Sequence, residues 1–164
     1  MEDSLGVRRS ERETLEGALD WYRAVIERKV DDLGIEQATR IMTPTGLSLL
    51  GVIRHLGWVE RGWFQEIFAG EVVESVDTEK DNSAEFTIDP DDTIESVISF
   101  YRFEVERSRQ IAVGSSLDDL SARTTKFGER VSLRWILVHM LEETARHAGH
   151  MDVMRETIDG STGD

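Results

Sequence analysis

The sequence predicts an all-α protein: a four-helix bundle with a long crossover between its second and third helices. Three observations lead to this fold class. Four stretches repeat apolar residues at three- or four-residue spacing, with charged residues between them. Each stretch is long enough for a helix of about 20 residues, which suits a bundle. About twenty residues separate the second stretch from the third, which is too many for a simple helical hairpin.

The first two helices are expected over about residues 12–33 and 46–68. The first has its apolar positions on one face, at Leu15, Leu19, Tyr22 and Ile26. Proline is tolerated in the first turn of a helix, where its missing N–H would have no partner. Pro44 therefore predicts the start of the second helix.

The third and fourth helices are expected over about residues 90–113 and 132–158. Pro90 predicts the start of the third, and Asp89 is the candidate residue to cap it. The crossover between the second and third helices would make them parallel. The connection over 114–131 contains the stretch KFGERVSL, whose glycine predicts a local turn over one end of the bundle.

Length and charge limit the organisation and the partners. The 164 residues predict a single domain over 1–164, with a flexible polar tail over about 159–164. With 33 acidic and 19 basic side chains the net charge is −14, which opposes binding to nucleic acid or to an anionic membrane. The start of the chain lacks the apolar centre of a signal peptide, so we expect a cytoplasmic protein. Because cysteine is absent, any thiol chemistry needs an external thiol.

The last helix carries three of the four histidines. At about 100° per residue, His147 falls within the apolar stripe, and Glu143 lies one turn earlier on the same face. Glu142 points roughly 140° away from His147 and Arg146 about 100° away, so both should be solvated. A carboxylate on a core-facing seam is costly unless it is paired or binds a metal. Glu143 therefore needs either a buried ion pair or a metal.

On the second helix, His55 lies at the edge of the apolar stripe. Together with Glu143 and His147 it could supply the three nitrogen or oxygen ligands of a catalytic zinc site. Spacing leaves rivals open, because His139 with Glu143 is an i, i+4 pair and His147 with His150 is an i, i+3 pair. His139 and His150 could instead orient the ligands from outside or be ordinary surface residues.

The stretches LSLLGVIRHLGWVERGWF and SLRWILVHMLEETARHAGHMDVMRETIDGSTG resemble the DinB-like superfamily, specifically its branch of small actinobacterial-type proteins. The resemblance implies a four-helix bundle with this crossover. It also implies a metal triad at His55, Glu143 and His147. Many relatives carry histidine where Glu143 stands. With a glutamate at this position, the ligand set resembles that of the mycothiol-dependent maleylpyruvate isomerases, whose zinc site consists of a histidine, a glutamate and a second histidine.

The resemblance implies a divalent metal, zinc or nickel, and transfer or isomerisation of a small-molecule substrate with a low-molecular-weight thiol such as mycothiol. A metal-dependent hydrolase is an alternative, because a metal with an open position can also activate water. The alternative outside the enzymes is a non-catalytic bundle protein that is related to stress or binds a ligand. Four-helix bundles of this kind often form a homodimer through one face. The apolar stripes alone do not determine the oligomeric state of this protein.

Overall fold

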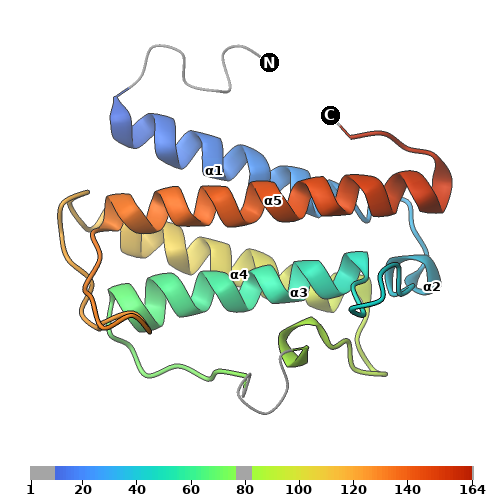
Figure 1. The fold of residues 1–164 in the computed structure, drawn as a ribbon, viewed down its shortest axis with the longest axis horizontal. Coiled ribbons are helices and arrows are strands. Elements are labelled where there is room, and N and C mark those ends of the chain that lie inside the picture. Colours follow the sequence, from blue (N-terminus) through green and yellow to red (C-terminus); the bar gives the residue numbers. More distant parts are fainter. Residues whose placement is uncertain (1–9, 77–82, 164) are drawn as a thin grey trace.

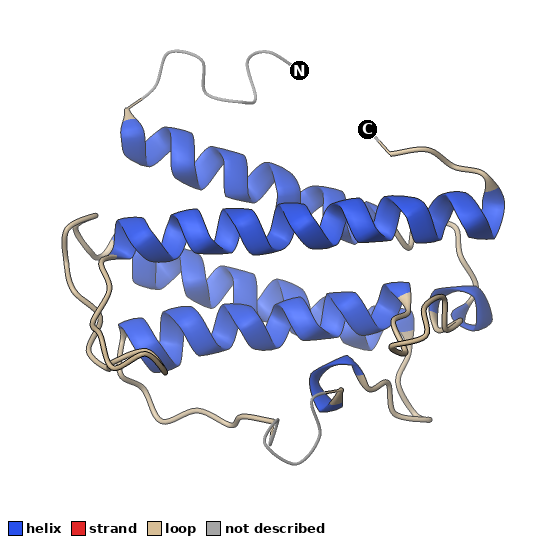
Figure 2. Ribbon diagram, in the orientation of Figure 1, coloured by secondary structure: helices blue, strands red, loops and turns tan. Residues whose placement is uncertain are grey.

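The computed structural model describes residues 10–76 and 83–163. Its long helices are α1 (Glu11–Arg28), α3 (Leu49–Glu60), α4 (Ile94–Val113) and α5 (Leu133–Asp159). The α3 helix continues directly into a π-helix, η1 (Arg61–Phe68). Figure 2 shows only helix and loop over the described residues, which confirms the all-α prediction.

The four long helices form a bundle in which α1 packs on α5 and α3 packs on α4. In Figure 1, α1 and α5 run from left to right, whereas α3 and α4 run from right to left. The chain after Phe68 therefore crosses back along the bundle before α4 begins. This is the expected crossover, and it leaves α3 parallel to α4. Its residues 77–82 lie outside the described part of the chain.

Hydroxyl side chains mark the helix starts, so the proline-based prediction was wrong. The Oγ of Ser48 accepts a hydrogen bond from the backbone N–H of Gly51 at 3.1 Å and caps α3. Thr93, not Asp89, caps α4 by accepting from the N–H of Ser96 at 3.0 Å. Pro44 and Pro90 lie in the loops before these caps. A capping hydroxyl accepts a hydrogen bond from an otherwise unpaired backbone N–H. Proline is only tolerated in the first turn and supplies no such bond.

The connection over 114–131 folds over the end of η1, as its glycine predicted. The N–H groups of Ala122 and Arg123 donate to the carbonyls of Phe68 and Ile67 at 2.8 and 3.0 Å. These bonds satisfy carbonyls that the end of a helix leaves without an intrahelical partner. Gly128 makes the turn with a φ of +83°, a conformation that favours glycine.

Two short helices were not foreseen: α2 (Ile35–Ala38) and the 3₁₀ turn η2 (Ala84–Phe86). Neither is long enough to show apolar periodicity. The second matters for the site, because η2 lies in the crossover and packs on α3. No described helix is both long and apolar enough to cross a bilayer.

Candidate metal centre between α3 and α5

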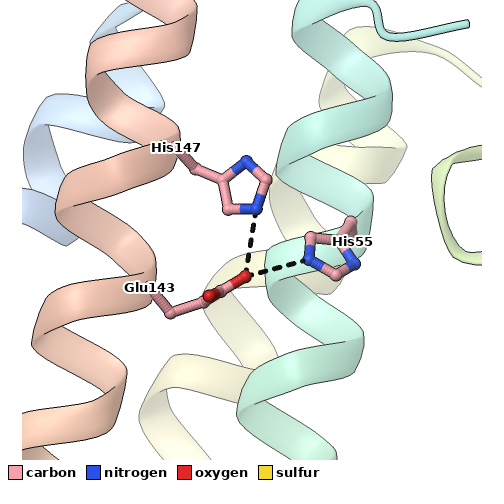
Figure 3. A group of neighbouring side chains, drawn as sticks. All are labelled: His55, Glu143 and His147. Carbon is pink, nitrogen blue, oxygen red and sulfur yellow. Dashed lines mark hydrogen bonds and ion pairs between the residues drawn. The ribbon is translucent and has the colours of Figure 1, made fainter. Parts of the chain in front are cut away.

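His55 projects from the middle of α3 toward α5 (Figure 3). Apolar residues on either side of it, Ile53 and Leu56, are buried and fix α3 against the core. The side chain of His55 is only 12% exposed, and its Nε2 lies 3.5 Å from Oε1 of Glu143. The edge of the apolar stripe thus places one imidazole nitrogen at the boundary between the two helices.

Glu143 and His147 lie one turn apart on α5 and face His55 (Figure 3). The Nε2 of His147 is 3.0 Å from the same Oε1 of Glu143 that faces His55. The other carboxylate oxygen, Oε2, forms an ion pair with Arg146. One oxygen of Glu143 therefore remains directed between the two imidazoles.

The three side chains have the donors that a divalent metal requires. One ligand atom from each of His55, Glu143 and His147 lies within 4.8 Å of the others. Burial, with the nearby His55 and Arg146, lowers the pKa of His147 to about 4, so its imidazole is neutral at pH 7 with a lone pair to offer. Two imidazoles and one carboxylate form a set typical of catalytic zinc, which keeps a further position for water or substrate. The residues therefore fit the metal that the resemblance implies.

The other candidate ligands on α5, His139 and His150, do not join the candidate metal centre. His139 packs its ring 4.6 Å from Trp63 and 5.1 Å from Trp135, measured between ring centroids, and burial lowers its pKa. His150 is exposed, with its ring 5.5 Å from that of His147. Neither joins the group of ligand atoms that the described residues form. That either one supports the ligands from outside stays a prediction.

Glu85 and Phe86 of η2 were missed by sequence reasoning and contact His55 directly. The Oε2 of Glu85 lies 2.8 Å from Nδ1 of His55. The ring of Phe86 stacks on the imidazole, with 4.1 Å between centroids and 15° between planes. No periodic pattern marks these positions, because they belong to a three-residue turn in the crossover.

A cavity of about 310 Å³ opens between the C-terminal half of α5 and the loop before α3, and its lining includes none of the three candidate ligands. His150, whose ring lies 5.5 Å from that of His147, lines the cavity, and the other lining side chains, which include Met42, Leu47, Val153 and Met154, carry no charge. A small, mostly apolar molecule could therefore occupy this space, separated from the candidate ligands by His150.

Comparison with known protein families gives an independent assignment. The family model described as mycothiol-S-transferase matches residues 14–160, which include all three candidate ligands. No curated protein matches the chain. The match confirms the resemblance to DinB-like proteins, because this family is of that type. The chain belongs to the mycothiol-S-transferase family.

Proposed function

We propose that this protein is a metal-dependent transferase that joins a low-molecular-weight thiol, such as mycothiol, to a small electrophilic substrate. The observation that carries the proposal is the convergence of His55, Glu143 and His147 on one point between α3 and α5. The family supports a small-molecule substrate and thiol transfer. Zinc suits the two imidazoles and one carboxylate best, with nickel as the alternative.

A bound divalent metal would favour the thiolate form of a coordinated thiol at neutral pH. The chain has no cysteine, so the reacting sulfur belongs to the cosubstrate. In the transfer, the thiol releases its proton to water, its sulfur bonds to the electrophilic carbon, and the leaving group departs with the electron pair of the broken bond. Glu143 and the two histidines would hold the metal, while Arg146 pairs with the second oxygen of Glu143.

The uncharged cavity lined by His150 is suited to a small, mostly apolar electrophile. Its lining is mostly apolar and its volume is about 310 Å³.

Metal analysis and a thiol-transfer assay test the proposal together. Protein purified without an affinity tag should contain one divalent ion per chain. It should consume mycothiol and an electrophile such as an alkyl halide. Removal of the metal with a chelator should abolish turnover, and added zinc or nickel should restore it. Metal-free protein that cannot be loaded, or turnover that is unaffected by complete metal removal, would contradict the proposal.

A metal-dependent hydrolase is the second candidate, because the same open position can activate water. Omission of the thiol separates the two activities. The transferase stops without mycothiol, whereas a hydrolase continues to cleave its substrate. A non-catalytic bundle would bind metal with a rise in melting temperature and show no turnover in either condition.

A further inference from the structure

The short turn η2 contacts His55 on two sides. Glu85 lies at the edge of the imidazole, with its Oε2 2.8 Å from Nδ1, and Phe86 covers one face of the ring. Glu85 is 27% exposed and His55 12%, so the pair is partly shielded from water. The imidazole is thus held by the crossover as well as by its own helix.

A neutral imidazole carries a single N–H, and its other nitrogen offers a lone pair. A carboxylate beside Nδ1 accepts a hydrogen bond, which places the proton on Nδ1 and leaves the lone pair on Nε2. The Nε2 of His55 faces Oε1 of Glu143, but at 3.5 Å this carboxylate is a much weaker acceptor than Glu85 at 2.8 Å. Glu85 therefore selects the tautomer that can bind a metal at the candidate centre.

His147 has no equivalent support. Its Nδ1 is buried and has no hydrogen-bond partner among the described residues. We propose that Glu85 is the positioning residue of the metal centre, fixing the tautomer and the orientation of His55. This inference rests on the proposed function, because it requires that His55 be a metal ligand.

Gly51 supports the inference independently. It lies in α3 one turn before His55, where an added Cβ would sit 2.6 Å from the backbone oxygen of Phe86. Glycine is unfavourable inside a helix, so its presence here allows the backbone of η2 to approach α3 closely. Any larger residue at position 51 must displace η2, and Glu85 moves with it.

Glu85→Ala is expected to weaken zinc binding by about 10- to 100-fold, the usual effect of losing an outer partner of a ligating histidine. Glu85→Gln keeps a hydrogen-bond acceptor and should lie between the wild type and the alanine variant. Competition with a chromophoric chelator, with Zn²⁺ alone as the probe, measures each affinity. The control is Glu74→Gln, in the same crossover with its side chain 82% exposed, which should bind zinc like the wild type.

Two further measurements exclude a merely structural role. Nitrogen NMR of the metal-free wild type should show the proton of His55 on Nδ1, and the alanine variant should lose this preference. Gly51→Ala should weaken zinc binding as Glu85→Ala does, whereas Gly62→Ala, whose Cβ would meet no atom within 4 Å, should not. A role in stability alone would change the melting temperature of the metal-free protein and leave the zinc affinity intact.

The outcomes separate this inference from the proposed function. Zinc binding by the wild type with equal affinity in Glu85→Ala would overturn the role of Glu85 and leave the metal centre standing. An unprotonated Nδ1 of His55 in the metal-free wild type would also overturn it. Failure of the wild type to bind any divalent metal would instead overturn the proposed function.

Discussion

His147→Ala is expected to lose the metal almost completely. Loss of a group that hydrogen-bonds a ligating histidine already lowers metal affinity by about 10- to 100-fold. Loss of one of the three direct ligands should therefore lower the affinity by more than about 100-fold. The imidazole is buried and its Nε2 lies 3.0 Å from Oε1 of Glu143, so the substitution removes one of the three donors that converge there. Metal content after purification without a tag, followed by chelator competition, measures the loss.

The neighbouring carboxylates Glu142 and Glu143 provide a matched pair of variants for the same measurement. Glu143→Gln removes the charged ligand between the two histidines and should lose the metal as His147→Ala does. Glu142→Gln makes the same chemical change one residue earlier, on the exposed side of α5, and should keep it. Equal metal content in all three variants would show that the metal, if present, is bound elsewhere.

Much of the candidate centre follows from helical geometry alone. The azimuths on the last helix separate Glu143 and His147 from Glu142, and the structure places the first two inward and Glu142 outward. Arg146 shows where azimuth is insufficient. It is exposed as expected, yet its long side chain reaches back to Oε2 of Glu143. A long, flexible side chain can reach the inward face of a helix even when its Cα lies on the outer face.

The choice of histidine and the role of Glu85 required tertiary structure. His139 stands at the same i, i+4 spacing from Glu143 as His147 does, and only the packing of α5 on α3 and η1 separates them. The contact between Glu85 and His55 could not be predicted from the sequence, because it depends on the path of the crossover through space. Gly51, in the first turn of α3, is the local signal, since a glycine within a helix indicates a close backbone approach.

Arg23→Met is expected to destabilise the fold more than any surface substitution. The guanidinium of Arg23 is 5% exposed and pairs with Glu60, which is 1% exposed. The contact is bidentate, with Nε to Oε1 and Nη2 to Oε2 both at 2.7 Å. Removal of one partner of a buried pair leaves an uncompensated charge and costs about 3–5 kcal/mol. For a protein of this size the melting temperature should fall by roughly 6–20 °C.

Two comparisons show whether the buried charge is the cause. Arg102→Met removes a guanidinium that is 64% exposed and paired with Glu27, and it should cost at most about 1 kcal/mol. The double variant Arg23→Met with Glu60→Met should recover much of the lost stability, because it leaves no unpaired carboxylate in the core. Denaturant unfolding of the metal-free proteins measures all three. A double variant no more stable than Arg23→Met would mean that the pair stabilises the bundle by packing alone, with no penalty from the charge left behind.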